Sequence, residues 1–216
     1  MPGKTKKHLC LALDVDSGQQ AVDLATELSP WVGLFKVGSQ LFTATGPAII
    51  DRLRQAGGEV FLDLKFHDIP NTVAAAGRIA VRHQVLMFNI HTAGGYRLMA
   101  TVAEAVREEA ERLGLRRPLL LGVTVLTSIN ADILKEELRV ALPLEQYVAH
   151  LARLAQQAGL DGVVASPREI GLIRQTCGAH FIILTPGIRP RWSVEPDDQQ
   201  RVTTPREALE QGSDYI

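Results

Sequence analysis

The sequence predicts an α/β protein, a (β/α)8 TIM barrel of parallel strands that is truncated in the eighth strand. Short β-rich runs alternate with helical patterns from end to end, at a spacing of roughly 25–35 residues that is typical of βαβ units. Seven complete strands and the start of an eighth favour this barrel over an open, doubly wound sheet. An open dinucleotide-binding sheet would carry G-x-G-x-x-G after its first strand, where this chain reads DVDSGQQ.

The expected strands are apolar runs rich in β-branched and aromatic residues. In chain order they are LCLALDV (9–15), GLFKVG (33–38), EVFLDLKF (59–66), VLMFNIHT (85–92), LLLGVTVLTS (119–128), GVVAS (162–166), FIILTPG (181–187) and DYI (214–216). Between the strands, apolar residues three and four positions apart predict helices. The predicted helices are AVDLATEL (21–28), AIIDRLRQAG (48–57), TVAAAGRIAVRH (72–83), LMATVAEAVREEAERLG (98–114) and LEQYVAHLARLAQQAG (144–159). Ser17 is a suitable N-cap, Pro47 suits a first helical turn, and Gly57 marks a helix end.

The chain has 216 residues, of which 46% are hydrophobic and 22% are charged, so it can build a substantial core. No Pro/Gly/Ser-rich linker divides it, and we expect a single barrel domain over residues 1–216. The sequence ends at Ile216, inside the expected eighth strand, whereas such barrels typically need about 250 residues. We therefore expect the C-terminal end of the domain to be incomplete, as in a truncated sequence of a complete barrel. If the protein itself ended at Ile216, we would expect an incompletely closed barrel with weakened or lost activity.

A formal net charge of −1 argues against nucleic acid or an anionic membrane as a partner. The apolar run from Leu9 to Val15 is too short for a signal peptide or a bilayer span. Cys10 and Cys177 lie far apart without metal-type spacing, and we expect both to be reduced and buried. These features predict a soluble, cytoplasmic protein.

Charged residues stand toward the ends of several expected strands, which is where barrel enzymes keep their chemistry. In FLDLKFHD (61–68), alternation puts the leucines and the second phenylalanine under the helices and turns Asp63, Lys65 and His67 inward. Asp14 and Lys36 take similar places on the first two strands. We expect one barrel mouth to carry an alternating array of two carboxylates and two ammoniums.

Two further polar residues belong to this mouth, and its charges have two alternative interpretations. Asp68, just past the third strand, can add another carboxylate, and Thr127 ends the expected fifth strand. A purely structural ion-pair network is the plain alternative, but replacing such networks by apolar residues is often neutral or stabilising. A metal site is the other alternative, with possible ligands Asp63, His67, Asp68 and His91. Lys36 and Lys65 would crowd a cation there, so no metal is expected.

The seventh strand ends in TPGIRPR (185–191), which points to phosphate binding. Gly187 permits close backbone approach, and a guanidinium such as that of Arg189 can hold phosphate through two hydrogen bonds. Barrels often bind phosphate after strands seven and eight. Arg191 is interpreted as an ordinary solvated arginine.

Together these segments resemble the orotidine 5′-phosphate decarboxylases over essentially the whole chain. The D-x-K-x-x-D core is shared with a wider group of phosphosugar barrels, and other segments narrow the resemblance to the decarboxylases. The matching segments are LALDVD (11–16), FKVGSQLF (35–42), DLKFHDIPNT (63–72), LTS (126–128), TPGIRP (185–190), and DDQQRVTTP (197–205) leading into GSDYI (212–216). The family continues past this point into a strand that ends in Gly-Arg.

The resemblance implies roles for individual residues. Lys65 would donate a proton to the product, Asp63 would sit against the departing carboxylate, and Asp14 and Lys36 would hold the ribosyl hydroxyls. Lys36, Asp63 and Lys65 would be the catalytic residues of one subunit. Asp68 would be a further catalytic residue of the same site, supplied by the neighbouring subunit of a homodimer. Residues implied to bind substrate elsewhere are Ile69 and Thr72 from that same neighbour, Thr127, Pro186, Arg189 and Gln199.

The implied activity is decarboxylation of orotidine 5′-phosphate to UMP in pyrimidine biosynthesis, without a cofactor. No cofactor-binding motif is visible, so fixed charge would have to stabilise the carbanion at C6. Two other functions remain open at this point. One is a magnesium-dependent phosphosugar decarboxylase or aldolase on the same barrel, and the other is a phosphometabolite-binding barrel without catalysis.

Overall fold

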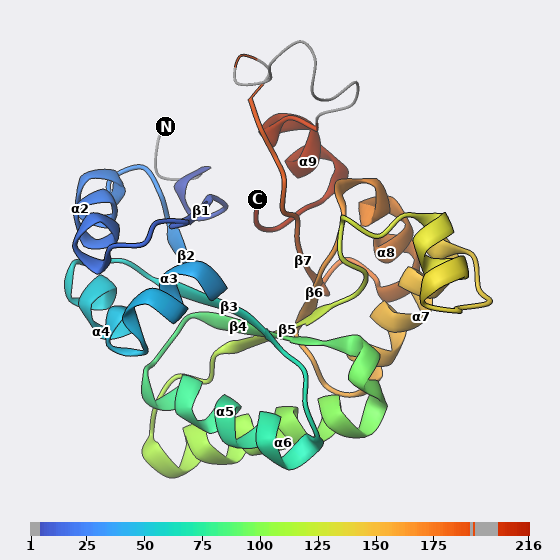
Figure 1. Cartoon of the computed structure of the whole chain (residues 1–216), viewed down its shortest axis with the longest axis horizontal. Helices are drawn as coiled ribbons and strands as arrows, with labels where there is room; N and C mark the ends of the chain where they lie inside the picture. Colours follow the sequence, from blue (N-terminus) through green and yellow to red (C-terminus); the bar gives the residue numbers. More distant parts are fainter. Residues whose placement is uncertain (1–4, 191, 193–202) are drawn as a thin grey trace.

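The computed structural model describes residues 5–190, 192 and 203–216, and this part of the chain forms one seven-stranded parallel sheet. The strands pair in chain order: β1 (Cys10–Ala12), β2 (Leu34–Gly38), β3 (Val60–Phe66), β4 (Met87–His91), β5 (Leu119–Val123), β6 (Gly162–Val164) and β7 (Ile182–Leu184). The sheet curls so that the helices lie on its outer side (Figure 1). This confirms the predicted parallel (β/α) barrel architecture.

The helices connect successive strands. They are α2 (Gly18–Leu28), α3 (Ser39–Thr45), α4 (Ala48–Gln55), α5 (Pro70–Arg82), α6 (Gly95–Leu113), α7 (Leu144–Gln157), α8 (Ile170–Cys177) and α9 (Pro205–Gln211), with short turns η1 (Thr92–Gly94), η2 (Ile133–Glu137) and η3 (Pro167–Glu169). Ser17 caps α2 by accepting from the Gln20 N–H, as predicted, and Gly57 follows α4 with a φ of +85°. In the described part of the chain, no helix is both long enough and apolar enough to cross a bilayer.

Four of these elements, α3, α8, α9 and η2, were not among the helices predicted from the sequence. Each is only five to eight residues long, so it spans too few turns for an apolar period to stand out. Local capping identifies one of them after the fact, because Thr204 and Glu207 form a reciprocal capping box at the start of α9.

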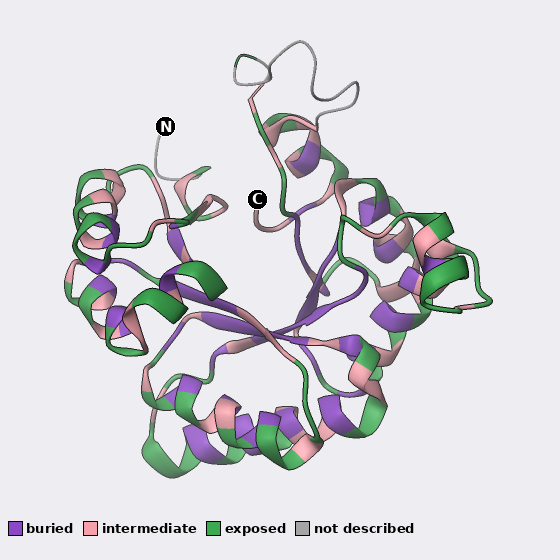
Figure 2. Ribbon diagram, viewed as in Figure 1, coloured by how far each residue is buried: buried purple, intermediate pink, exposed green. Residues whose placement is uncertain are grey.

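Two apolar layers follow from strand alternation. The larger layer lies between the sheet and the helices and includes Leu62, Phe88 and Ile90. The smaller layer fills the inside of the curled sheet and consists of Leu34, Phe61, Met87, Leu121, Val123, Val164 and Leu184. Figure 2 shows buried residues along the strands and on the helix faces that cover them. Side chains that alternate with the inner layer therefore face the helices.

Several strands are shorter than predicted. The fifth was expected to run to residue 128 but ends at Val123, so Thr127 lies in the following turn rather than on the strand. The seventh was expected over residues 181–187 but ends at Leu184. Thr185 still donates its N–H to the Tyr215 carbonyl, and Pro186, which has no N–H, cannot extend the ladder.

Residues 214–216 connect the two edges of the sheet. Tyr215 forms a parallel bridge with Leu184, while the Ile216 carbonyl accepts from the Cys10 N–H at 2.8 Å. Asp214 is fixed beside them, because its carboxylate accepts from Arg174 at 2.6 Å and from the Ile183 N–H at 2.8 Å. The predicted start of an eighth strand is thus present and joins β7 to the segment that opens β1.

Candidate active site

Four charged side chains form an alternating chain where β1, β2 and β3 approach their C-terminal ends. The Lys36 ammonium lies 3.1 Å from Asp14 and 3.6 Å from Asp63, and the Lys65 ammonium lies 2.7 Å from the other oxygen of Asp63. This is the array that the sequence predicts. We call these four residues the charge array.

The charge array runs from solvent into the barrel. The Asp14 side chain is 57% exposed, whereas that of Asp63 is only 11% exposed. A buried carboxylate is costly unless cations and hydrogen-bond donors compensate it, and Asp63 has both lysines for this purpose. The array therefore presents ammonium groups around one deep, fixed negative charge.

The backbone of β3 departs from regular geometry at Lys65. Its φ is +50°, and the pairing of β3 with β4 shifts register between Leu62 and Phe66. Such a bulge re-aims side chains, and a left-handed conformation is unusual for a residue with a Cβ. Leu62 still faces the helix-side layer while Asp63 points inward, so the predicted sidedness of the strand is retained.

Sequence reasoning missed two residues that shape this site. Asn89 of β4 is fully buried and donates to Asp63 at 2.6 Å. Gly38 ends β2, where a Cβ would stand 2.9 Å from the Lys36 ammonium nitrogen, so glycine leaves room for that group. The available signal for Asn89 was an amide two positions from Met87 and from His91, on the inward face of an otherwise apolar strand.

Two histidines and a cysteine border the charge array. The His67 and His91 rings lie 5.3 Å apart, and burial, together with His67 and Lys65, lowers the pKa of His91.

Burial raises the pKa of Cys10 to about 12, so its thiol stays protonated. Cys10 and Cys177 are both free and half-buried rather than fully buried. Within the described residues, no three His, Cys, Asp or Glu side chains group as potential metal ligands.

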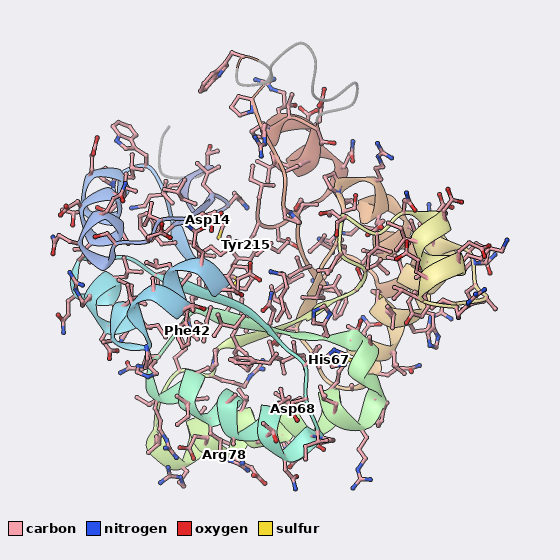
Figure 3. All side chains as sticks on the ribbon, in the orientation of Figure 1. Asp14, Phe42, His67, Asp68, Arg78 and Tyr215 are labelled. Atoms are coloured by element: carbon pink, nitrogen blue, oxygen red, sulfur yellow. The ribbon has the colours of Figure 1, made fainter. Side chains whose placement is uncertain are left out.

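Asp68 lies outside the charge array of its own chain. Its carboxylate accepts the Ile69 N–H at 2.6 Å, and no ion pair joins it to Lys65 in the described part of the chain. Figure 3 shows Asp68 near the start of α5, well separated from Asp14. Ile69 is 67% exposed and Thr72 is also exposed, so all three face outward from this subunit.

The remaining predicted residues lie on loops. Thr127 is exposed in the turn after β5, and Pro186 and Arg189 are exposed after β7. The Arg189 N–H donates to the Thr203 carbonyl at 3.4 Å, which ties this loop to the start of the segment before α9. Gln199 lies outside the described residues.

Known proteins that are similar in sequence to this chain indicate a single family. The sequence profile of the "Orotidine 5′-phosphate decarboxylase / HUMPS family" matches residues 7–216. The chain is 52% identical to an orotidine 5′-phosphate decarboxylase from Syntrophomonas wolfei over 99% of its own length and 89% of that protein. It is 54% identical to one from Syntrophotalea carbinolica, over 99% and 86%.

A solved structure agrees with these sequence matches. The crystal structure of orotidine 5′-phosphate decarboxylase from Lactobacillus acidophilus is similar to this chain with a TM-score of 0.83. The two are 34% identical, and the match covers 96% of this chain and 88% of the other.

Proposed function

The chain belongs to the orotidine 5′-phosphate decarboxylase / HUMPS family, and we propose that it decarboxylates orotidine 5′-phosphate to UMP by means of the charge array, without a cofactor. The observation that carries this proposal is the Lys65 ammonium, fixed 2.7 Å from Asp63 at the mouth of the barrel. The high identity to decarboxylases over nearly the full chain favours this reaction over phosphosugar chemistry and over binding without turnover.

Loss of CO2 from C6 of the orotate ring leaves an sp2 carbanion without a carbonyl placed to delocalise it. A preorganised cation is the remaining means of stabilising that charge. Lys65 is the cation in our proposal: its ammonium attracts the developing carbanion and then protonates it to give UMP. Asp63 accepts a hydrogen bond from this ammonium and holds it in place at the mouth of the barrel.

The other members of the charge array orient the substrate. Asp63 faces the departing carboxylate, where repulsion adds a smaller contribution than carbanion stabilisation. Asp14 and Lys36 bind the ribosyl hydroxyls, and their contact at 3.1 Å holds the two groups ready for that role. Because Asp14 is the exposed member, the ribose enters on the solvent side of the array.

The phosphate end binds away from the broken bond. Arg189 and Gln199 hold the phosphate, Pro186 lines the same loop, and Thr127 contacts the pyrimidine and ribose. Binding energy from this remote group organises the charge array, so its contacts raise turnover as well as affinity. The exposed positions of Pro186 and Arg189 after β7 support this role.

We further infer that the working unit is a homodimer in the cytoplasm with sites shared between subunits. Asp68, Ile69 and Thr72 extend from the start of α5 toward the partner's charge array. Two exposed apolar side chains, Ile69 at 67% and Tyr96 at 51%, support an interface on the side of α5 and α6. In this dimer, Asp68 completes the active site of the partner subunit rather than that of its own chain.

The direct test of the proposed reaction is an assay with EDTA that follows the loss of orotidylate absorbance and the formation of UMP. We expect turnover without added metal. Turnover of a ketose phosphate that needs magnesium would support the aldolase alternative instead. Tight binding of UMP with no turnover by a folded preparation would support a binding protein.

Mixing two inactive variants tests the shared site. Dimers that combine one Lys65→Ala chain with one Asp68→Ala chain have one intact composite site, so random exchange should restore about a quarter of wild-type activity. Each variant alone should remain nearly inactive. Absence of recovery, when mass spectrometry shows that subunits have exchanged, would refute the shared site.

A further inference from the structure

Asn89 lies between the two groups on which the proposed reaction depends. We propose that Asn89 is a positioning residue: its side-chain amide links the strained backbone of Lys65 to the carboxylate of Asp63 and so fixes both for catalysis. This inference rests on the proposed function, and it assigns Asn89 no contact with the substrate.

Both ends of the amide are used. The Asn89 nitrogen donates to Asp63 Oδ1 at 2.6 Å, and the Asn89 oxygen accepts the Lys65 backbone N–H at 2.8 Å. Asn89 is 0% exposed, so its side-chain amide depends on protein partners rather than on solvent for these hydrogen bonds. The amide nitrogen is thus directed at the Asp63 carboxylate and the amide oxygen at the Lys65 backbone. Buried polar groups that are fully hydrogen-bonded in this way hold their partners in one arrangement.

The backbone of Lys65 explains why an acceptor is needed here. Lys65 has a φ of +50° within the register shift of β3 against β4, and the ladder between them does not provide its regular pairing there. A buried N–H without a partner is costly, and the left-handed conformation adds strain of its own. The Asn89 oxygen supplies the missing acceptor and compensates for the conformation that aims the Lys65 side chain into the mouth.

The donor end of Asn89 fixes the carboxylate. Asp63 Oδ1 accepts from both Asn89 and the Lys65 ammonium, while the other oxygen faces the Lys36 ammonium at 3.6 Å. A neutral donor orients the carboxylate without changing the net charge of the array. Aspartate would add repulsion at this position. Leucine would leave the Lys65 N–H without its acceptor and would remove one of the donors to Asp63.

The first experiment compares Asn89→Leu, which is similar in size, with Thr92→Val. Thr92 is equally buried, and its hydroxyl donates to the Val123 carbonyl rather than to Asp63 or Lys65. Asn89→Leu should lower kcat by roughly 10- to 100-fold with a smaller change in KM, which is the effect of losing a supporting hydrogen bond. Thr92→Val should keep wild-type kcat. Wild-type kcat in Asn89→Leu, or an equal loss in Thr92→Val, would overturn the proposal.

The second experiment uses Asn89→Asp and pH. This variant keeps an acceptor for the Lys65 N–H but places a second carboxylate against Asp63, and two such groups share a proton more readily as the pH falls. A protonated carboxyl at position 89 can donate to Asp63 as the amide did. The ratio of variant to wild-type kcat should therefore rise as pH decreases, and a ratio independent of pH would overturn the proposal even if Asn89→Leu does not fold.

A third measurement does not depend on turnover. Amide hydrogen exchange at Lys65 should be slow in the wild type, slow in Asn89→Asp and Thr92→Val, and faster in Asn89→Leu. Unchanged exchange in Asn89→Leu would contradict the role of Asn89. Failure of the wild type to convert orotidylate would refute the proposed function instead, and the exchange data would still decide the role of Asn89.

Discussion

Two buried carboxylates in this chain each contact two cations, yet their surroundings differ. Glu109 of α6 is 4% exposed and receives hydrogen bonds from Arg82 of α5 at 2.8 Å and from Arg112 at 2.8 and 3.0 Å. Asp63 contacts two lysines at 2.7 and 3.6 Å. The arginines are planar and are themselves more than half exposed, whereas the lysines are compact point charges drawn toward the inside of the barrel.

The difference separates a structural site from a chemical one. At Glu109, hydrogen bonds from the two guanidiniums lower the pKa of the carboxyl to about 2 and connect α5 to α6. At Asp63, the two cations are lysines of β2 and β3. The backbone of one of them, Lys65, is strained, and the charge array opens to the mouth of the barrel. Charges kept in a strained, costly position are explained by catalysis better than by stability.

The largest effect should come from Lys65→Ala. We expect it to abolish detectable conversion of orotidylate, because the cation that stabilises and protonates the C6 carbanion is gone. The circular dichroism spectrum should remain unchanged, and sedimentation should give the same oligomeric state as for the wild type. Retained turnover would exclude Lys65 as the proton donor.

Glu109→Gln is expected to lower stability while turnover is retained, the reverse of Lys65→Ala. This change leaves the two arginines without their carboxylate and should lower the thermal midpoint at neutral pH, while kcat stays within about twofold of wild type because the charge array is remote. Exposed Glu104, which pairs with Arg107, provides the matched control, since Glu104→Gln should change neither quantity. A turnover defect in Glu109→Gln without loss of stability would break the comparison.

The wild type and Glu109→Gln should also differ in how their stability against unfolding responds to acid. The folded protein lowers the pKa of Glu109 from 4.5 to about 2, so this carboxylate stabilises the fold fully above the unfolded pKa. That contribution should be lost as the pH falls from 4.5 through about 2. Urea unfolding at several pH values should show the wild-type advantage over Glu109→Gln shrinking in this window, and a constant difference would contradict the assignment.

The smallest effect isolates backbone strain at the charge array. Lys65→Gly and Lys65→Ala both remove the ammonium, but only glycine adopts a φ of +50° without steric strain. Lys65→Gly should therefore be more stable than Lys65→Ala by about 1 kcal/mol in denaturant unfolding. Equal stability, or a more stable alanine variant, would show that the conformation of residue 65 is not strained.

The sequence predicted the features that depend on local periodicity and on strand alternation. The parallel barrel follows from repeated βα units, and the array of Asp14, Lys36, Asp63 and Lys65 follows from the sidedness of the strands. Strand ends were less accurate, as β5 shows, because ladder pairing depends on partners far away in sequence.

The unpredicted parts of the site depend on register between strands. Asn89 could be recognised as an inward amide, but its contacts with Asp63 and Lys65 require the shifted pairing of β3 and β4. The positive φ of Lys65 likewise has no signal in the residue itself, since lysine rarely adopts it. Both are set by tertiary packing rather than by local sequence.

Chemical restoration of the ammonium tests the central claim most directly. Lys65→Cys should be inactive, and alkylation of the new thiol with 2-bromoethylamine returns an ammonium at nearly the original distance. Burial raises the pKa of both native thiols, Cys10 and Cys177, so the reagent should favour position 65, with treated wild type as control. Our account predicts that turnover of orotidylate returns in proportion to modification at position 65. A fully modified, folded protein that stays inactive, or an unmodified one that is active, would contradict it.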